Sequence, residues 1–351
     1  MDSIRVVVVD DSAFMRKMIT DILSSDNRIE VVATAKNGED GLQKIADFKP
    51  DVVTLDVEMP IMDGITALRK LMQSDPLPVV MLSSVTEEGA TKTVQAISIG
   101  AVDFVAKPSG AISLDLNKIS EEILTKVLTA AQANISKSQP VSTTRKITGT
   151  DTKEYDKTIV GIGSSTGGPK ALQNVLSDMP DDFQAAVLIV QHMPAGFTKS
   201  LAKRLDALVP IKVKEAVHGE IIQKSTAYIA PGNYHMKVRA VGTAYAIELT
   251  REKPVFGHRP AVDTLFESIA NVQKVNKIAV VLTGMGSDGA EGINILKEKD
   301  PGAIIVAESE KSSVVYGMPK AAVKTNHVDH IVHLHQVEDT ITKLVNRSRG
   351  M

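Results

Sequence analysis

Cysteine, long apolar runs and an excess of charge of one sign are all absent from this sequence. Without cysteine the chain has no disulfides, thiolate metal ligands or thiol nucleophile, which fits a cytosolic protein. No apolar run reaches the roughly 18 residues that a membrane-spanning helix needs, so we expect no membrane insertion. The net charge is −2 and there is no strongly basic block, which argues against nucleic acid as a partner.

What remains is a chain of ordinary globular composition that is long enough for two domains. It has 351 residues, of which 43% are hydrophobic and 23% are charged. Its first residues, Met1–Arg5, lead straight into a strand-like run and lack the pattern of a signal peptide. We therefore expect a cytoplasmic protein with two domains.

Strand-like and helix-like segments alternate through the first part of the chain. Ile4–Val9 is a continuous aliphatic run, which is typical of a strand buried on both faces. The pattern predicts further strands at 31–35, 51–55, 78–82 and 101–105, with a helix after each of the first four strands and a closing helix at about 119–133. This alternation predicts a flavodoxin-like α/β domain over residues 1–133, with a five-stranded parallel sheet.

Polar residues stand directly after four of these strands: Asp10, Asp11, Asp56, Ser83 and Lys107. The carboxyl ends of parallel strands meet at one edge of a sheet, where ligands bind. Three carboxylates in a small space repel one another, and an all-oxygen site that relieves this repulsion suits Mg²⁺. Together with a hydroxyl and a lysine, the site suits phosphoryl transfer to Asp56. The alternative is that each of these residues is a solvated helix cap or loop residue. This alternative explains a single acid well, but it does not explain five such residues at four strand ends.

These residues carry a resemblance to the receiver domain of two-component response regulators, over residues 1 to about 125. The matching motifs are Asp10-Asp11, Asp56 with Met59-Pro60 and Asp63-Gly64, Ser83, and Lys107-Pro108. The resemblance implies that Asp56 is the phospho-acceptor, with a histidine kinase as phosphodonor. It also implies Asp10, Asp11, Asp56 and the carbonyl of Glu58 as Mg²⁺ ligands, Ser83 and Lys107 as phosphoryl contacts, and Phe104 as the switch aromatic.

A linker is predicted over residues 134–156, which have few apolar side chains and many Ser, Thr and Lys. Pro140 and Gly149 interrupt any regular structure in it. As a random coil it would span on the order of 25 Å. The effective concentration of one domain at the other would then be roughly millimolar, which suits regulation within one chain. The second domain is predicted over residues 157–351.

The second domain opens with an apolar run, Thr158–Ile162, that ends abruptly in small residues before a helical pattern begins. Gly163, Ser165 and Gly167 fit the pattern G-x-S-x-G. The glycines tolerate positive φ and leave the serine hydroxyl uncrowded, so the stretch suits a nucleophile elbow. The alternative reading is an anion-binding or merely tight turn. A dinucleotide site is disfavoured because Thr166 stands where its third glycine belongs.

Further strands in the second domain are predicted at 185–190, 211–217, 227–230, 235–240, 244–249, 277–282 and 303–306. The turn at Val241–Thr243 predicts a hairpin between the fourth and fifth of these strands. We therefore expect a doubly wound α/β domain with a mainly parallel sheet and an antiparallel hairpin.

Ser165, His192 and Asp288 each follow an aliphatic strand, so the same edge argument brings them together. A serine hydroxyl needs a base near neutral pH, imidazole has a suitable pKa, and a carboxylate fixes the imidazole tautomer. The chain order differs from that of α/β-hydrolases, but geometry rather than order defines a triad. Backbone N–H groups at the turns, Met285 first and also Thr166, are candidates to hold the oxyanion.

Several residues compete for these roles. Ser164 and Thr166 are rival nucleophiles, His235 and His258 are rival bases, and Asp263 is the rival acid. Four histidines near the C-terminus could suggest a metal site, but their spacing alternates through a strand-like run, which indicates a structural or solvated face: His327, His330, His333 and His335.

The second domain resembles the catalytic domain of the bacterial chemotaxis protein-glutamate methylesterases. The resemblance rests on Gly161–Gly168, Gln191–Pro194, Ala230–Gly232, His258–Pro260 and Gly284–Gly289. Ser164 is a departure, because relatives often have alanine there. The resemblance implies hydrolysis of glutamate γ-methyl esters on chemoreceptors with release of methanol, and deamidation of receptor glutamines, with no cofactor in this domain.

With the receiver in front, the whole chain is expected to be a phosphorylation-activated esterase. In this interpretation the receiver covers the esterase cleft until Asp56 is phosphorylated by a chemotaxis histidine kinase. The alternative is a response regulator whose second domain binds receptors without catalysis. It predicts no methanol release and no labelling by serine-directed reagents.

Overall fold

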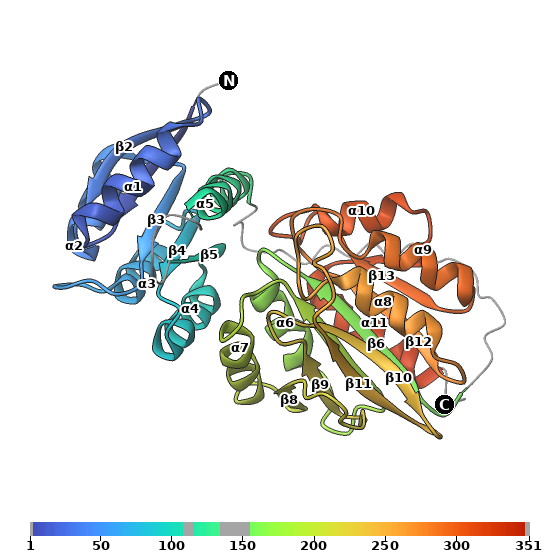
Figure 1. Cartoon of the computed structure of the whole chain (residues 1–351). Helices are drawn as coiled ribbons and strands as arrows, with labels where there is room; N and C mark the ends of the chain where they lie inside the picture. The colour runs from blue at the N-terminus through green and yellow to red at the C-terminus, as the bar shows by residue number, and fades with distance from the viewer. Residues whose placement is uncertain (1–2, 108–115, 134–154, 348–351) are drawn as a thin grey trace. The chain divides into compact units, whose positions relative to one another are not determined.

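The computed structural model describes residues 3–107, 116–133 and 155–347, and the chain divides into two compact units (Figure 1). The first unit comprises residues 1–136 and the second unit residues 137–351. Of the predicted linker, residues 134–154 lie outside the described residues. Tyr155 is held by the second unit, because its N–H donates to Asn276 Oδ1 at 3.3 Å and its carbonyl accepts from Asn276 Nδ2 at 2.6 Å.

The first unit contains a five-stranded parallel sheet in the order β2-β1-β3-β4-β5. Its strands are β1 (Ile4–Val9), β2 (Ile29–Ala35), β3 (Val52–Asp56), β4 (Val79–Ser83) and β5 (Asp103–Ala106). Its helices are α1 (Ala13–Ser24), α2 (Gly38–Phe48), α3 (Gly64–Ser74), α4 (Glu87–Ile99) and α5 (Leu116–Ala130). The predicted flavodoxin-like fold is confirmed. The strand order reverses between β1 and β3, so their carboxyl ends border the crevice where such folds bind ligands.

The first four helices begin at capping side chains, namely Ser12, Asn37, Asp63 and Thr86. Each side-chain oxygen accepts the backbone N–H three residues further on, at distances from 2.7 to 3.3 Å. Losing such a cap typically costs about 1 kcal/mol. The caps fix where each helix starts, so the connections from the carboxyl ends of β1 and β3, where the acidic residues lie, are short and of defined shape.

The second unit contains a seven-stranded sheet in the order β14-β13-β12-β6-β7-β9-β8, with every pair parallel. Its strands are β6 (Thr158–Ser164), β7 (Ala186–Gln191), β8 (Lys212–Glu215), β9 (Thr226–Ile229), β12 (Asn276–Val281), β13 (Ile304–Glu308) and β14 (His330–Val332). The predicted antiparallel hairpin is formed by β10 (His235–Val241) and β11 (Ala244–Thr250). Central strand β6 lies between β7 and β12, so the chain changes direction across the sheet here and the carboxyl ends of all three strands adjoin.

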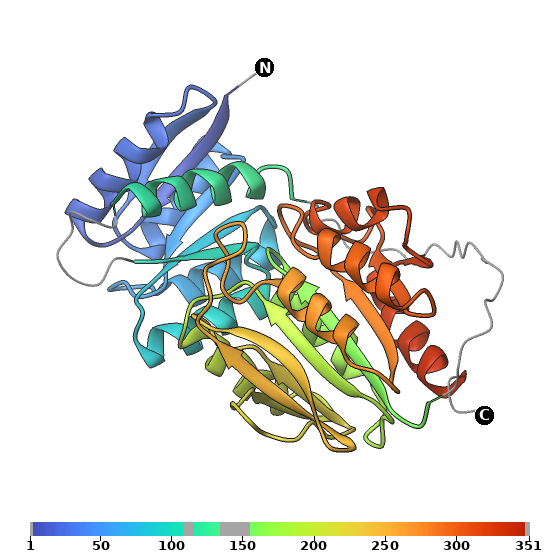
Figure 2. The ribbon, with the colours of Figure 1, turned by 45° about the vertical axis from the view of Figure 1, so that its right-hand side comes forward.

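Helices cover both faces of this sheet, as Figure 2 shows for the orange α8 and α9 in front of it. The helices are α6 (Gly168–Ser177), α7 (Phe197–Asp206), α8 (Val262–Asn271), α9 (Ala290–Lys299), α10 (Met318–Lys324) and α11 (Leu334–Arg347). Helix α8 packs on β6, and glycine makes this close approach possible. A Cβ at Gly163 would lie 2.4 Å from Val262 Cγ1, and one at Gly161 would lie 2.8 Å from Ile269 Cδ1.

Two details differ from the sequence-based expectations. We expected Gly163 and Gly167 to tolerate a positive φ angle. Only Gly167 has one, at 77°, whereas Gly163 leaves room for the packing of α8. The predicted strands did not include β14, because three residues are too few to show a strand period.

Candidate active site

Three carboxylates meet at the carboxyl edge of the first unit's sheet. One oxygen each from Asp10, Asp11 and Asp56 lies within 4.8 Å of the others. Lys107, which follows β5, places Nζ 2.8 Å from Asp10 Oδ2 and 2.7 Å from Asp56 Oδ2. Carboxylate oxygens grouped in this way are the ligands that Mg²⁺ prefers, so the donor set fits the expected cation.

Burial and neighbouring charges shift the pKa values of the groups in this acidic site. Burial raises the pKa of Asp56 to about 6, and the negative charge of Asp10 adds to the rise, while Lys107 opposes it. The pKa of Lys107 is raised despite its own burial, because both carboxylates hydrogen-bond to it. On β5, buried Phe104 has the ammonium of Lys126 5.0 Å from its ring centroid.

Two further predicted residues lie near the acidic site but make other contacts. The Glu58 N–H donates to Asp56 Oδ1 at 3.4 Å, while its carboxylate pairs with Lys92 at 2.8 Å. Ser83 is fully buried at the end of β4, and its hydroxyl donates to the Gly89 carbonyl at 3.1 Å. Among the described residues, the Asp56 carboxylate therefore hydrogen-bonds to Lys107 and to the Glu58 backbone, and not to Ser83.

In the second unit, Ser165 stands in the predicted strand–turn–helix connection between β6 and α6. Its N–H donates to the Thr283 carbonyl at 3.0 Å, which ties the turn to the loop after β12. Its carbonyl accepts from the Gly168 N–H at 2.8 Å and from Gln191 Nε2 at 2.9 Å. Helix α6 begins at Gly168, its N-cap residue Gly167 provides no side-chain cap, and the positive end of the helix dipole lies at the turn.

His192 and Asp288 form a buried pair at the same edge. Strands β6 and β7 lie in register, and the His192 N–H donates to the Ser164 carbonyl at 3.1 Å, so His192 follows β7 where Ser165 follows β6. His192 Nε2 and Asp288 Oδ2 are 2.7 Å apart, and the two side chains are 7% and 2% exposed. His192 Nδ1 is buried without a hydrogen-bond partner among the described residues. With Nε2–H committed to the carboxylate, Nδ1 is the nitrogen that can accept a proton.

Asp288 is positioned by backbone donors as well as by the imidazole. Its Oδ2 accepts the Val262 N–H at 2.7 Å and its Oδ1 accepts the Asp263 N–H at 2.9 Å. Burial alone would raise the pKa of Asp288, but hydrogen bonding and charge interaction with His192, together with the two backbone N–H groups, hold it below its usual value. Asp288 is therefore ionised at neutral pH and suited to stabilise an imidazolium.

The rival nucleophiles are buried. The Ser164 hydroxyl is 0% exposed and donates to Gln191 Oε1 at 2.7 Å. Thr166 is 7% exposed, and its carbonyl accepts from Thr283 Oγ1 at 3.0 Å. Of the three consecutive hydroxyl residues, only Ser165 is partly exposed.

Rival base His235 and rival acid Asp263 serve the backbone instead. His235 is fully buried, its Nε2 pairs with the Lys253 carbonyl at 3.1 Å, and its Nδ1 accepts the Ala261 N–H at 3.3 Å. Asp263 Oδ1 accepts the N–H groups of Gly289 at 2.8 Å and Gly292 at 2.7 Å, which anchors the start of α9. Burial raises the pKa of Asp263 above its usual value, with the charge of Asp288 adding to the rise.

His258, expected in a loop as a rival base, lies directly against His192. The two imidazole rings stack with centroids 3.9 Å apart and planes 7° apart. Sequence reasoning missed this contact because the stretch from β11 to α8 has no regular pattern. The motif His258-Arg259-Pro260 was the available signal.

Two buried polar residues near the site, Gln191 and Glu308, were not predicted to be functional. Gln191 links the two turns, because its Nε2 donates to the carbonyls of Ser165 at 2.9 Å and His192 at 3.3 Å. Behind Thr283, buried Glu308 accepts the Thr283 N–H at 2.8 Å. Burial raises the pKa of Glu308 to about 7. The signal for both residues was a polar side chain at the end of an aliphatic strand.

The histidine run near the C-terminus has structural contacts. His333 Nδ1 and Ser309 Oγ are 2.6 Å apart, and the rings of His333 and His335 stack at 5.8 Å. Within the described ranges, the only group of three or more acidic or histidine side chains spaced for a metal ion is that of Asp10, Asp11 and Asp56.

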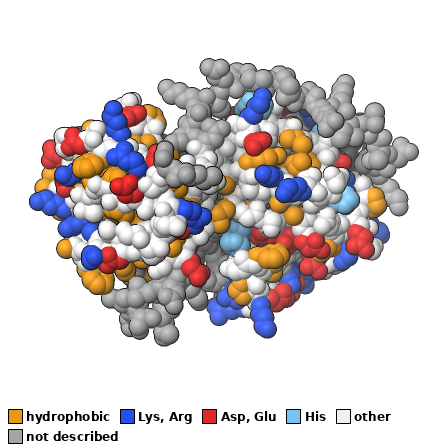
Figure 3. Space-filling model, turned by 90° about the horizontal axis from the view of Figure 1, so that it is seen from above, with side chains coloured by type: hydrophobic (Ala, Val, Ile, Leu, Met, Phe, Trp, Pro, Cys, Tyr) orange, Lys and Arg blue, Asp and Glu red, His pale blue; other side chains and the backbone are white. Residues whose placement is uncertain are grey.

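On the face in Figure 3, Lys and Arg side chains are interspersed with acidic and apolar ones. None of the helices in the described part of the chain is long and apolar enough to cross a membrane.

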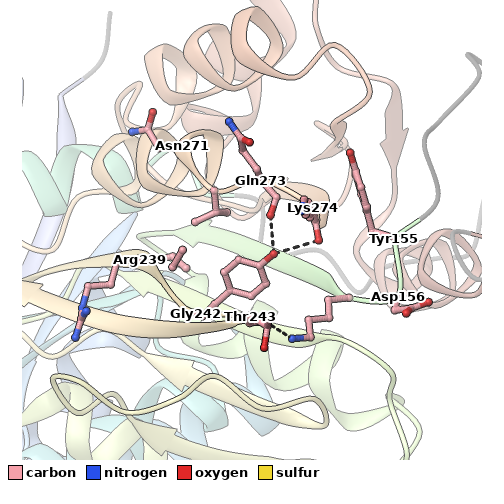
Figure 4. A pocket seen from close by; sticks show the side chains of 13 residues that line it. Tyr155, Asp156, Arg239, Gly242, Thr243, Asn271, Gln273 and Lys274 are labelled. Carbon is pink, nitrogen blue, oxygen red and sulfur yellow. Dashed lines mark hydrogen bonds between the residues drawn. The ribbon is translucent and has the colours of Figure 1, made fainter.

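A pocket of about 770 Å³ opens at the opposite end of the second unit's sheet, where β6 begins (Figure 4). The hydroxyl of Tyr245 in it donates to the carbonyls of Gln273 at 2.6 Å and Lys274 at 3.1 Å. The Lys157 ammonium donates to a carbonyl of the β10–β11 turn at 2.6 Å. These polar groups bond to the surrounding backbone, and the length of β6 separates the pocket from Ser165.

Comparisons with known proteins cover both units. The family model described as CheB methylesterase matches residues 160–341, and the one described as response regulator receiver domain matches residues 6–117. A crystal structure of the Thermotoga maritima CheB methylesterase catalytic domain matches with a TM-score of 0.51 at 38% identity, covering 54% of this chain and 98% of that one.

Curated relatives match the chain over nearly its full length. A protein from Oceanobacillus iheyensis is 54% identical over 98% of this chain and 99% of its own length. One from Halalkalibacterium halodurans is 52% identical with the same coverage. Both are named protein-glutamate methylesterase/protein-glutamine glutaminase.

Proposed function

The chain belongs to the CheB methylesterase family and carries a response regulator receiver domain, and from this premise we propose that it hydrolyses glutamate γ-methyl esters on chemoreceptors. The products are methanol and a glutamate side chain. The observation that carries the proposal is the partly exposed Ser165 beside the buried His192–Asp288 pair, on adjoining strand ends.

In the proposed reaction, Ser165 Oγ attacks the ester carbonyl while His192 Nδ1 takes its proton. Asp288 stabilises the imidazolium through Nε2–H at 2.7 Å. The tetrahedral intermediate collapses, and methanol leaves with the proton from Nδ1. Water then attacks the acyl-enzyme, again giving its proton to His192, and frees the carboxylate. The backbone N–H groups of Thr166 and Met285 are the proposed oxyanion donors, since one follows the nucleophile at the start of α6 and the other lies in the loop after β12.

The same groups also support deamidation of receptor glutamines. A γ-amide presents a carbonyl of the same geometry, and the imidazolium would protonate the departing amine to release ammonia. The shared acyl-enzyme means that one serine serves both reactions, so a Ser165 variant should lose both together.

The first unit is proposed to regulate this activity through Asp56. A chemotaxis histidine kinase would supply the phosphoryl group, with Ser83 and Lys107 contacting it after transfer. Asp10, Asp11, Asp56 and the Glu58 carbonyl would hold Mg²⁺, which when bound offsets the negative charge of the phosphoryl oxygens. Lys107, already within 2.8 Å of both Asp10 and Asp56, would keep a positive charge at the acceptor.

Phosphorylation is proposed to relieve inhibition of the esterase by the receiver. The modification adds about −1.5 to −2 charges at one point. Switching a two-state equilibrium almost completely needs about 5.5 kcal/mol of differential stabilisation. Competition from bound receptor would lower the share that phosphorylation has to supply.

The decisive assay measures methanol release from methylated receptor by the full chain, with and without a small phosphodonor. We expect low release without the phosphodonor, a strong increase with it, and no increase in Asp56→Asn. A fragment of residues 150–351 should be active without phosphodonor. Equal activity of fragment and unphosphorylated full chain would refute inhibition by the receiver. No release from any form would favour a second unit that only binds receptors.

A further inference from the structure

The turn Val255–His258, whose last residue contacts the proposed catalytic base, presents an exposed phenylalanine. The Val255 N–H donates to the His258 carbonyl at 3.0 Å, and the His258 N–H donates to the Val255 carbonyl at 2.8 Å. This closes a two-residue hairpin with Phe256 and Gly257 at its tip. Phe256 is 73% exposed, while His258 at the foot of the turn stacks on His192 at 3.9 Å.

Phe256 has a backbone conformation that phenylalanine rarely adopts. Its φ is 48° and that of Gly257 is 81°, so both central residues are left-handed, as in a type I′ turn. Such turns favour Asn-Gly or Asp-Gly, because a bulky side chain at positive φ is strained. Folding alone would therefore favour asparagine at this position. Strain of this kind concentrates where a protein contacts its ligand.

Hydrogen bonds of Arg259, which follows the turn, anchor the backbone that carries the exposed ring. Arg259 Nη1 donates to the carbonyls of Arg251 at 3.2 Å and Glu252 at 2.9 Å. The Arg259 carbonyl accepts the Asn233 N–H at 3.1 Å. The apolar side chain of Met285, 41% exposed, lies in the loop that leads to Asp288, so a second loop of the same site also presents an apolar group.

We propose that Phe256, together with Met285, binds the receptor segment that carries the methyl ester. This inference rests on the proposed function. The methyl ester is uncharged, and its methyl group and aliphatic stem offer apolar surface that an exposed aromatic ring can cover. Phe256 is therefore a substrate-binding residue that raises affinity for the receptor, and it takes no part in proton transfer.

The test compares Phe256→Asn with wild type in the full chain, activated by a small phosphodonor, over a range of methylated receptor concentrations. Asparagine suits the left-handed turn, so the variant should unfold at the same or a higher temperature than wild type. Removing the ring's contact should raise KM about tenfold, whereas kcat should stay within about twofold. Phe256→Leu, which keeps an apolar contact, should recover much of the lost affinity.

Val241→Asn is the matched control, because Val241 is 39% exposed at the tip of the β10–β11 hairpin, at the pocket end of the sheet. It should leave KM unchanged. An unchanged KM in Phe256→Asn, or an equal rise in the control, would overturn the proposal. So would a rise in unphosphorylated activity without a change in KM, which would assign Phe256 to the contact with the receiver. If wild type itself releases no methanol, the proposed function fails instead.

Discussion

Replacing Asp288 with asparagine should separate the carboxylate's charge from its hydrogen bonds. The carboxylate accepts from His192 Nε2 at 2.7 Å, from the Val262 N–H at 2.7 Å and from the Asp263 N–H at 2.9 Å. An asparagine amide keeps most of these bonds by placing its oxygen toward His192 and Val262. Its NH₂ group then faces the Asp263 N–H, and a buried donor left unsatisfied costs about 1–3 kcal/mol of stability.

The effect on catalysis should be larger, because the lost charge faces the imidazolium that forms during the reaction. Unit charges 2.7 Å apart attract by about 6 kcal/mol at an effective dielectric constant of about 20. The hydrogen bond to the amide oxygen remains, so part of this energy is retained. We therefore expect kcat for methanol release to fall about 10³–10⁴-fold. KM should change little, because Asp288 is only 3% exposed and lies behind His192.

The assay is steady-state methanol release by the phosphorylated chain, with thermal unfolding measured on the same samples. Asp263→Asn is the matched control, since it removes the neighbouring buried carboxylate, which makes no hydrogen bond to His192. That variant should lose stability but keep kcat within about tenfold. If Asp288→Asn also keeps kcat within tenfold, Asp288 does not stabilise the imidazolium and the proposed triad is wrong.

Three further predictions follow from residues around the two sites. Gln191→Leu removes the hydrogen bonds that link the two turns, so it should lower kcat and cost about 1–3 kcal/mol, measured by methanol release and urea unfolding. Glu308→Gln should flatten the pH dependence of stability. The pKa of Glu308 in the folded protein is raised from 4.5 to about 7. The stabilisation of the folded state that goes with this shift is fully present below pH 4.5 and is lost as the pH rises through 7, by about 3 kcal/mol at most. Between pH 5 and 8, the unfolding temperature of the second unit in Glu308→Gln should therefore rise relative to that of wild type as the pH rises. Parallel curves of unfolding temperature against pH would contradict this. Gly64→Ala should destabilise the first unit by at least about 1–3 kcal/mol, because its Cβ would lie 1.9 Å from the Asp56 carbonyl oxygen; an unchanged first-unit transition would refute this.

Sequence patterns predicted the positions that local structure determines. Ser165, His192 and Asp288 each follow a continuous aliphatic strand, and parallel strands place such residues at one edge of a sheet. The starts of α1 and α3 are also encoded locally, because the capping side chains of Ser12 and Asp63 act only three residues away.

Positions that depend on distant parts of the chain could not be predicted. The stack of His258 on His192 depends on a loop tied down by Arg259, and no local pattern encodes that contact. The choice of Nε2 for Asp288 depends on where Val262 presents its N–H, at the start of a helix 26 residues earlier in the chain. Gly163 reads as part of an elbow in sequence, yet the structure uses it for the packing of α8.

The central claim, that Ser165 is the nucleophile, is tested most directly by covalent labelling. Wild type treated with a fluorophosphonate should lose methanol release in step with labelling, and peptide mass spectrometry should find the adduct on Ser165. Ser165→Ala should be neither labelled nor active, while its Asp56 still accepts a phosphoryl group. An adduct on Ser164 or Thr166, or full methanol release from Ser165→Ala, would contradict the account.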